Sequence, residues 1–301
     1  MRGNDVLVSV GLPVRNAADR LERVIGSVLA QDHEHIRLVV SDNASTDDTE
    51  ELCRELARSD RRILYHRQTE NVGILNNFIT VMRLAEGDLF RWVGDDDWLA
   101  PHCVSRMVDV FARDERLLLV TSQTAYTGPD GVTESAEYVG TGLTSDDPVD
   151  RFAEMLRMLN ESHLLIDPLY GMVRRDRVVA IARRNMLRED EVFAAKLALA
   201  GPWAHVPEVL GHRHWKHERM PEIARRLDVP PWQAHFASVL QCVEMLRWLS
   251  ATRLTAEQRR RARRAVYGWY ARRQWRTTAH RGRKLIQMAS GALTPRPGAG
   301  H

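Results

Sequence analysis

The chain has 301 residues, enough for one large α/β domain with an appendage or for two modest domains. Its hydrophobic share of 44% is ordinary for a globular protein, and no stretch reaches the roughly 18 consecutive apolar residues of a membrane span. The first residues lack the apolar core of a signal peptide, and 3 cysteines are too few for a disulfide framework or a zinc cluster. We therefore expect a cytoplasmic protein.

The first 125 residues alternate between strand and helix patterns. Short apolar runs predict strands at residues 6–13, 36–42, 62–66, 88–93 and 117–121. Between them, apolar residues at helical spacing predict helices around 21–29, 46–56 and 74–85 and after Pro101. This alternation predicts βαβ units and a Rossmann-like α/β fold, with a mostly parallel sheet flanked by helices. Ligands of such sheets bind at the carboxyl ends of the strands.

The second half is less regular. It predicts a turn at 128–131, helices at 149–159 and 190–199, and strands at 170–173 and 206–210. Two long helical patterns follow, at 232–249 and 256–288. We expect a catalytic domain at 1–217, divided into a nucleotide-binding half (1–125) and an acceptor-binding and catalytic half (126–217). A helical C-terminal extension (218–290) and a disordered tail (291–301) would complete the chain.

An acidic turn, residues 94–98 (Gly-Asp-Asp-Asp-Trp), follows the fourth predicted strand. Three successive carboxylates repel one another unless a cation compensates. Mg²⁺ and Mn²⁺ take oxygen ligands, typically one or two carboxylates together with substrate phosphates. The turn therefore predicts a site for a divalent cation and a diphosphate. A solvated acidic turn that caps the next helix is the alternative.

Asp42 and Asn43 end the second predicted strand, on the same edge of the sheet. A carboxylate there can accept a hydrogen bond from the N3–H of a pyrimidine base. The alternative is a helix-capping cluster, since Thr46 and Asp47 follow at once and such residues cap helices well. The two roles are compatible.

Several segments resemble the motifs of the family 2 glycosyltransferases, which have the GT-A fold. Their order and spacing match the family over roughly residues 6–215. They are residues 12–16 (Leu-Pro-Val-Arg-Asn), residues 40–49 (Val-Ser-Asp-Asn-Ala-Ser-Thr-Asp-Asp-Thr), Glu70-Asn71-Val72-Gly73 with Asn77, and Gly87-Asp88 ahead of the acidic turn. The resemblance implies an inverting transfer of a sugar from a nucleotide diphosphate, usually UDP and otherwise dTDP or GDP, to a hydroxyl acceptor. The acceptor would be a glycan, a lipid-linked intermediate or a small molecule.

The resemblance also implies a donor site with Mn²⁺ or Mg²⁺. Asp96, the last residue of the family's Asp-x-Asp motif, would bind the metal, assisted by Asp97 and His214. Gly94 stands where the family has its first Asp, so the choice between Asp95 and Asp97 as the second carboxylate stays open. His217 is a second candidate histidine, and Arg213 could stabilise the diphosphate charge. The nucleotide-binding residues implied are Pro13, Val14, Arg15, Asn16, Asp42, Asn71, Gly73, Asn77 and Asp95.

The resemblance places the catalytic base at residues 188–193, with Asp190 first and Glu189 second. A positioned carboxylate can take the proton of an acceptor hydroxyl as this attacks the anomeric carbon. An acidic helix start, favoured by the helix dipole, is the alternative. Trp98, Tyr170, Gly171 and Arg174 are implied at the sugar or acceptor. A plain buried strand is the alternative for the segment from Tyr170 onward.

Basic charge is concentrated near the C-terminus. Residues 253–284 contain 11 Arg, 1 Lys and 1 Glu, a balance of +11, so the rest of the +3 chain carries −8. The pattern places Ala262, Val266, Trp269 and Tyr270 on one side of a helix and Arg259, Arg260, Arg263 and Arg264 elsewhere. Such a helix can lie on an anionic membrane, here the inner face. It can equally pack on the domain or on a second subunit of a homodimer.

Rival functions are a degenerate transferase that binds nucleotide sugars without turnover and a nucleic-acid-binding protein. The complete acidic turn and the acidic pair argue against the first. The acidic body and the lack of an aromatic RNA-binding signature argue against the second, so no nucleic acid is expected. A dinucleotide-dependent dehydrogenase is disfavoured because the first strand leads to Gly11-Leu12-Pro13 and not to a Gly-x-Gly-x-x-Gly turn.

Overall fold

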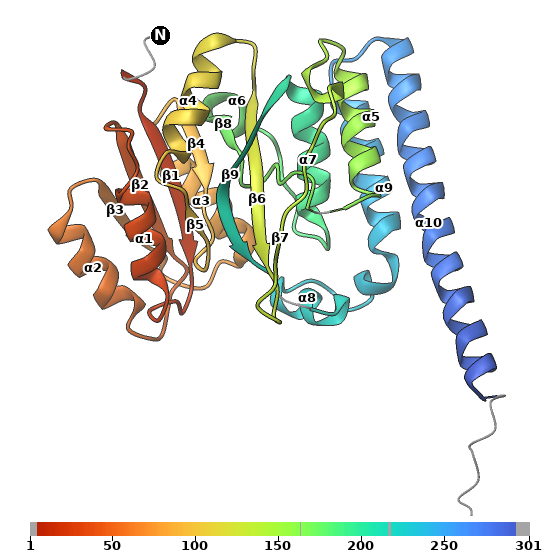
Figure 1. Cartoon of the computed structure of the whole chain (residues 1–301), viewed down its shortest axis with the longest axis horizontal. Helices are drawn as coiled ribbons and strands as arrows, with labels where there is room; N and C mark the ends of the chain where they lie inside the picture. Colours follow the sequence, from red (N-terminus) through yellow and green to blue (C-terminus); the bar gives the residue numbers. More distant parts are fainter. Residues whose placement is uncertain (1–4, 163, 216–217, 293–301) are drawn as a thin grey trace, which may run out of the picture.

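A nine-stranded sheet forms the centre of the molecule (Figure 1). The computed structural model describes residues 5–162, 164–215 and 218–292, and only the backbone from residue 277 onward. The strands are β1 (Val8–Val14), β2 (Ile36–Asp42), β3 (Ile63–Arg67), β4 (Leu89–Trp92), β5 (Trp98–Leu99), β6 (Leu119–Thr127), β7 (Thr133–Glu134), β8 (Met172–Arg174) and β9 (Trp203–His214). The helices are α1 (Leu21–Leu29), α2 (Thr49–Ser59), α3 (Ile74–Leu84), α4 (Cys103–Arg113), η2 (Gly142–Thr144), α5 (Pro148–Met158), α6 (Arg175–Val178), α7 (Glu189–Ala200), α8 (Met220–Arg226), α9 (Gln233–Ala251) and α10 (Ala256–Ala292).

The sheet is parallel in its first half and mixed in its second. The strand order is β3-β2-β1-β4-β8-β6-β9-β5, with β7 paired to β6. The pairs among β3, β2, β1 and β4 are all parallel. β8 is then inserted antiparallel between β4 and β6, and β6 pairs in parallel with β9. The predicted mostly parallel order therefore holds among β3, β2, β1 and β4 and again between β6 and β9, and the short antiparallel β8 interrupts it.

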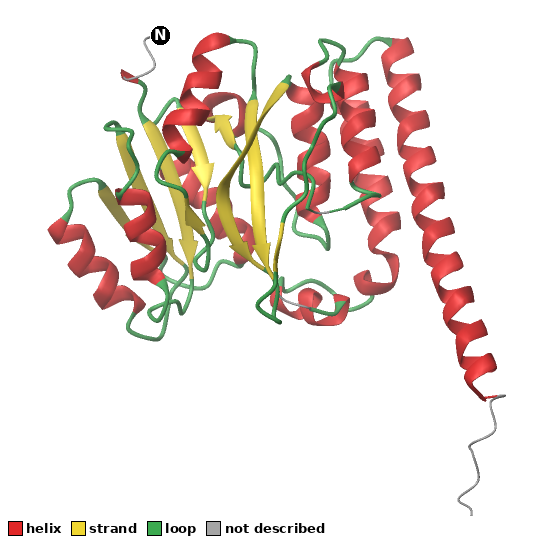
Figure 2. Ribbon diagram, in the orientation of Figure 1, coloured by secondary structure: helices red, strands yellow, loops and turns green. Residues whose placement is uncertain are grey.

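Helices cover both faces of the sheet, which explains the uninterrupted apolar strands (Figure 2). All seven residues of β1 are buried. α1 and α4 pack on one face and contribute to its core Ile25 and Met107. α3 and α7 pack on the other, where Trp92 and Phe193 meet edge to face with ring centroids 6.1 Å apart. The predicted α/β architecture is confirmed.

The C-terminal helices pack on the body of the molecule. Ala262, Val266 and Trp269 of α10 are fully buried against α5, α7 and α9. This contact confirms the predicted apolar side of the helix. It also shows that this side packs on the domain, one of the alternatives to contact with a membrane. α10 extends to Ala292, so the predicted disordered tail begins no earlier than residue 293; residues 293–301 lie outside the described chain. Within the described residues, no helix is both long and apolar enough to cross a bilayer.

Candidate active site

The acidic turn is closed by its own last carboxylate. The backbone N–H of Gly94 donates to Oδ2 of Asp97 at 3.2 Å, and the N–H of Asp97 donates to the Gly94 carbonyl at 3.3 Å. A Cβ at position 94 would lie 2.6 Å from Asp97 Oδ2, too close for any side chain. The departure from the family motif at Gly94 thus has a physical reason: glycine lets Asp97 fold back over the turn.

Arginines from other elements pair with two of the three aspartates. Arg20, which precedes α1, donates to Asp95 Oδ2 from Nη2 at 2.6 Å and from Nε at 3.2 Å. Arg213 of β9 donates from Nε to Asp97 Oδ2 at 2.9 Å. Burial raises the pKa of both carboxyl groups above the usual range, and the paired arginines oppose this shift. The turn is therefore held in place by β9 and by the loop after β1.

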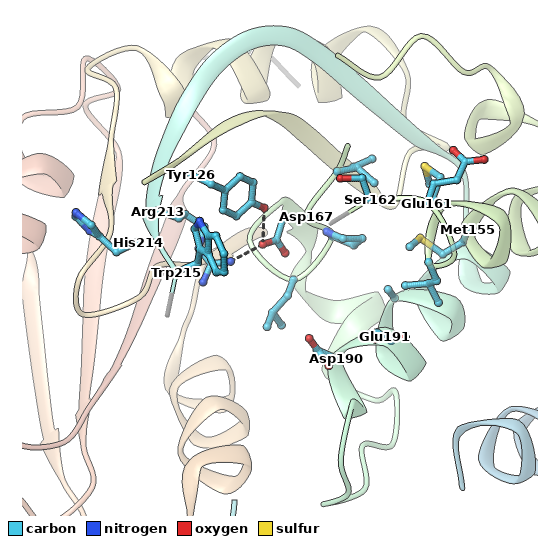
Figure 3. A pocket seen from close by; sticks show the side chains of 16 residues that line it. Tyr126, Met155, Glu161, Ser162, Asp167, Asp190, Glu191, Arg213, His214 and Trp215 are labelled. Atoms are coloured by element: carbon cyan, nitrogen blue, oxygen red, sulfur yellow. Dashed lines mark hydrogen bonds and ion pairs between the residues drawn. The ribbon is translucent and has the colours of Figure 1, made fainter. Parts of the chain in front are cut away.

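Arg213 also joins the turn to a second carboxylate. It pairs with Asp167, which comes from the segment between α5 and β8, and its guanidinium lies 3.6 Å from the ring centroid of Tyr170. Tyr126 donates its hydroxyl to the same Asp167 oxygen at 3.1 Å. Asp97, Arg213 and Asp167 thus form a continuous network. Figure 3 shows the part of it in which Tyr126 and Arg213 meet Asp167. Stabilisation of the diphosphate charge by Arg213 was one possibility that the sequence offered; in the structure Arg213 pairs with two protein carboxylates.

His214 lies beside the turn, and Trp98 is the last residue of the turn. Nδ1 of His214 is 2.8 Å from the carbonyl oxygen of Asp96, which places the imidazole against the turn. Trp98 stacks on His212 with centroids 4.6 Å apart and planes 2° apart, and Arg23 lies 3.6 Å from its ring centroid. His217, the second candidate metal ligand, lies outside the described residues. The predicted contact of Trp98 with a sugar stays a prediction.

The loops after β1 and β2 are tied together at the same edge. Val14 pairs with Asp42 in the ladder, so the residues that follow both strands are adjacent. Asn16, at φ +50°, accepts from the Thr46 N–H at 2.8 Å, and its own N–H donates to Ser45 Oγ at 2.9 Å. Arg15 and Asn16 are exposed. Pro13 and Val14 are buried in the sheet, so only their backbone can contribute to a nucleotide site.

Asp42 differs from its prediction. Its side chain is 0% exposed, and both oxygens are saturated. Oδ1 accepts from the N–H and hydroxyl of Ser45, and Oδ2 accepts from Tyr65 at 2.8 Å and Arg67 at 2.9 Å. The prediction of an accessible Asp42 carboxylate that binds a pyrimidine base is therefore corrected. Asp42 instead holds the loop after β2 in place. Of the capping alternative the structure shows one contact: Asp47 accepts from the N–H of Thr49, the first residue of α2, at 3.1 Å, while the N-cap residue Asp48 makes no side-chain capping hydrogen bond.

Three further predicted nucleotide residues lie at α3: Asn71 and Gly73 just before the helix, and Asn77 in its first turn. The side chain of Asn43 bridges to Asn71 at 2.7 Å and to the Val72 N–H at 2.8 Å. Gly73 has φ +84°, a conformation that favours glycine. Asn77 is 3% exposed and donates to the carbonyl oxygens of Ser41 and Val14. Asn77 therefore lies under the site and holds the strand ends, which corrects its expected contact with the nucleotide.

Asp190 and Glu189 have different environments at the start of α7. Glu189 is bound by Arg183, with contacts of 2.8 Å and 2.5 Å to its two oxygens. Asp190 is exposed and lines two recesses, of about 320 Å³ and about 660 Å³. The protein atoms packed around the carboxyl group partly desolvate it and so raise the pKa of Asp190, and the charge of Glu189 adds to the rise. Of the two, Asp190 presents an available carboxylate.

The residues predicted to contact the sugar or the acceptor do not lie at one site in the structure. β8 runs away from the site, because Met172 pairs with Arg91 and Arg174 with Leu89, the first residue of β4. Tyr170 precedes β8 and lies at the site beside Arg213. Arg174 lies at the opposite edge, where Nε donates to the Leu117 carbonyl at 2.9 Å. The prediction for Arg174 is therefore wrong.

Gly171 is also corrected. It is buried, and a Cβ there would lie 2.5 Å from a Leu119 methyl and 2.9 Å from the Val120 carbonyl oxygen. Glycine at this position allows β8 to approach β6 closely. The segment is therefore a plain buried strand, which was the alternative to contact with the sugar or acceptor. Asp167 and Tyr126 were missed, because neither belongs to a motif or a periodic pattern.

The profile of the family described as "Glycosyl transferase family 2" matches residues 9–178, more than half of the chain. Abequosyltransferase RfbV of Salmonella typhimurium is 37% identical over 100 residues, 32% of this chain and 29% of that protein. Glycosyltransferase GlyA of Streptococcus pneumoniae is 34% identical over 95 residues, 32% of this chain and 14% of that protein. The chain thus spans less than a third of the length of either relative.

Solved structures share the fold. S. aureus TarS 1-349 superposes with a TM-score of 0.62 at 15% identity, covering 88% of this chain and 71% of that one. A mannosyltransferase of Pyrobaculum calidifontis, in complex with GDP-Man and Mn²⁺, gives a TM-score of 0.53 at 16% identity and covers 96% of this chain and 81% of that one. These likenesses confirm the GT-A type of α/β fold. The profile match over residues 9–178 shows that the chain belongs to glycosyl transferase family 2.

Proposed function

We propose that this chain is an inverting glycosyltransferase that moves a sugar from a nucleotide diphosphate, UDP in the first place, to a hydroxyl acceptor. One observation carries the proposal beyond family membership. Arg213 binds Asp97 of the acidic turn and lines the same recess as Asp190. This arrangement supports a single site that contains both the predicted donor residues and the predicted base, as a transfer reaction requires.

In this reaction Asp190 accepts the proton of the acceptor hydroxyl while the hydroxyl oxygen attacks the anomeric carbon. The bond from that carbon to the diphosphate breaks, and its electron pair leaves with the nucleotide. Attack from the face opposite the leaving group inverts the configuration. A raised pKa suits Asp190 as a base, because a stronger base takes a hydroxyl proton more readily. Arg15 and Asn16, exposed after β1, together with Asn71 and Gly73 would line the nucleotide.

The acidic turn offers a partial fit for a divalent cation. Oδ1 of Asp97 is buried, and no described residue hydrogen-bonds it. The His214 ring lies next to Asp96. No cluster of three or more potential ligands is assembled within the described residues, so substrate phosphates would have to complete the coordination. Asp96, with Asp97 and His214, would hold Mn²⁺ or Mg²⁺, which neutralises the charge of the leaving diphosphate.

Thermal unfolding with UDP, dTDP, GDP and CDP, each with and without Mn²⁺, tests the donor site. A ligand that binds only the native state raises the melting temperature. We expect the largest rise with UDP and Mn²⁺ together, and loss of the Mn²⁺-dependent part in Asp96→Ala. Asp146→Ala, a change at an 80% exposed side chain, is the matched control. If no nucleotide raises the melting temperature, or if Asp96→Ala responds like the control, the donor site is wrong.

We also propose peripheral contact of α10 with the inner face of the membrane, in an otherwise cytoplasmic protein. Tyr267 is 56% and Trp275 72% exposed, and Arg260, Arg264 and Arg276 are exposed on the same helix. Exposed aromatic and basic side chains favour an anionic bilayer surface. Flotation with vesicles of phosphatidylglycerol and phosphatidylcholine, compared with phosphatidylcholine alone, should show binding to the anionic vesicles only. Equal flotation of Tyr267→Ser/Trp275→Ser and the parent chain would refute this contact.

A further inference from the structure

The base segment, residues 187–191, carries the predicted base Asp190 and leads into α7. Arg188, the last residue before the helix, has φ +60°, a left-handed conformation that is unfavourable for residues other than glycine. Such a conformation persists only where the surrounding structure enforces it. The base segment therefore depends on contacts with other parts of the chain.

Helix α9 holds the base segment at both ends. α7, α9 and α10 share one apolar core, and from this core side two buried glutamines of α9 reach the segment (Figure 1). Gln233 Oε1 accepts from the Leu187 N–H at 3.2 Å. Gln241 Nε2 donates to Glu191 Oε2 at 3.0 Å and lies 3.4 Å from the Arg188 carbonyl oxygen. The backbone before α7 and the first turn of α7 are thus bound to the same helix.

Helix α10 adds an arginine to the same segment. Arg273 donates from Nη1 to Glu191 Oε2 at 2.6 Å and from Nη2 to Oε1 at 3.1 Å. Two parallel contacts of this kind are the strong and directional form of an arginine–carboxylate pair. The two side chains are 14% and 21% exposed, so water screens the pair less than a surface pair. Glu191 therefore connects the base segment to both C-terminal helices.

Asp190 lies between two bound carboxylates. Glu189 is paired with Arg183, and Glu191 is paired with Arg273, whereas Asp190 is exposed. Successive side chains of a helix point in directions about 100° apart, so holding both neighbours also fixes the direction of the side chain between them. A base must lie within hydrogen-bond reach of the proton that it takes, and a small displacement of a catalytic group lowers the rate strongly.

We propose that Arg273 of α10 and Gln241 of α9 are positioning residues for the base. Through Glu191 they hold the base segment so that Asp190 faces the reacting hydroxyl. The C-terminal helices are thereby part of the active site, in addition to their packing on the domain. The proposal rests on the proposed transferase function and on Asp190 as its base, but the hold on the segment is measured without turnover.

Amide hydrogen exchange, followed by mass spectrometry on the full chain without ligand, measures this hold. In Arg273→Met we expect the peptide that contains residues 187–193 to exchange about tenfold faster, because its segment opens more often. Arg261→Met is the matched control: Arg261 lies on the same helix but pairs with Asp147 and Asp150 at the start of α5. The control should leave exchange of this peptide unchanged. Equal exchange in Arg273→Met and in the control would overturn the proposal.

Turnover shows whether the hold acts on the base. The assay is UDP release from UDP-glucose, UDP-galactose and UDP-N-acetylglucosamine, in which water replaces the acceptor and gives its proton to Asp190. Dividing the rate by UDP-binding sites counted by titration leaves unfolded protein out of kcat. We expect Arg273→Met to lower kcat about tenfold with the donor KM unchanged. Arg273→Lys, which keeps the charge without the two-point contact, should lie between, and Arg261→Met should stay within about twofold of the parent chain.

A double variant tests the route through Glu191. In a Glu191→Gln background, Arg273→Met should lower kcat by less than about twofold, because the carboxylate through which Arg273 acts is already gone. A full tenfold loss in both backgrounds, or a kcat of Arg273→Met equal to that of Arg261→Met, would overturn the positioning role. If the parent chain releases UDP from none of the donors, the proposed function fails, and the exchange measurement still decides whether Arg273 holds the base segment.

Discussion

Arg213 and Asp97 form an ion pair, Nε to Oδ2 at 2.9 Å, that ties strand β9 to the acidic turn 116 residues earlier in the chain. Asp97 is 3% exposed. Its negative charge can be buried because a guanidinium compensates it. The same guanidinium binds Asp167, so one cation holds both carboxylates.

Asp97→Asn should therefore destabilise the protein. Removing one partner of a buried pair leaves an imperfectly compensated charge, and we expect a loss of about 1–3 kcal/mol in the free energy of unfolding, less than for an isolated pair because Arg213 keeps Asp167. Urea denaturation measures it. Glu86→Gln, which removes the exposed pair with Arg37, is the control and should cost under about 0.5 kcal/mol. Equal losses in the two variants would contradict the structural role of the pair.

Gly94→Ala should open the acidic turn. The added Cβ would lie 2.6 Å from Asp97 Oδ2, so the carboxylate must leave its hydrogen bond to the turn. We expect a loss of about 1–3 kcal/mol in unfolding free energy, together with a weaker Mn²⁺-dependent thermal shift. Gly26→Ala in α1 is the matched control: its Cβ meets nothing within 4 Å, and helix propensity predicts a gain of up to about 1 kcal/mol. If Gly94→Ala lowers the free energy of unfolding no more than Gly26→Ala does, this account of Gly94 is wrong.

Asp42→Asn tests the corrected role of Asp42. An amide nitrogen in place of Oδ2 cannot accept from Tyr65 and Arg67, so we expect a loss of about 2–3 kcal/mol in unfolding free energy. A residue that only touched the nucleotide base would leave the unliganded protein unchanged. Denaturation without ligand separates the two cases.

Asp190→Asn should lower kcat by at least about 10²-fold and leave the nucleotide-dependent thermal shift intact, because the amide cannot take a proton. Glu189→Gln should act mainly on stability, since it leaves Arg183, 6% exposed in its side chain, without its charged partner. Donor consumption and urea denaturation of both variants provide the comparison. If Glu189→Gln abolishes turnover in a fully stable protein while Asp190→Asn stays active, the assignment of the base is reversed.

The pH dependence of kcat follows from the raised pKa of Asp190. The base must be deprotonated to act, so activity is complete above this pKa and is lost as the pH falls through it. Because partial desolvation by the surrounding protein and the charge of Glu189 raise the pKa, the acid limb should lie above the ordinary value of about 4 for aspartate. Measurement of kcat between pH 4 and 9 checks it, with the unfolding midpoint followed over the same range. An acid limb at or below the ordinary value would mean that another group serves as the base.

The strand ends and the acidic turn could be predicted from the sequence. Buried parallel strands are continuous apolar runs, and their carboxyl ends share one edge, so Asn16, the loop after β2 and the acidic turn had to meet there. The family motifs then supplied roles for Asp96 and Asp190, which stay predictions. Both α9 and α10 could also be predicted from the sequence, because helical periodicity depends only on residues close together in the chain.

Only the tertiary structure decided which side chains are accessible to a ligand. Three residues of β8 carry no signal of strand direction, and their antiparallel insertion leaves Tyr170 at the site and moves Arg174 to the far edge. Asp42 and Asn77 have the chemistry of ligand contacts, yet hydrogen bonds from distant segments bury them. Arg213 and Asp167 meet across 46 positions of sequence. Periodicity and motif spacing describe neighbours along the chain, whereas burial and charge pairing depend on which segments the folded sheet brings together.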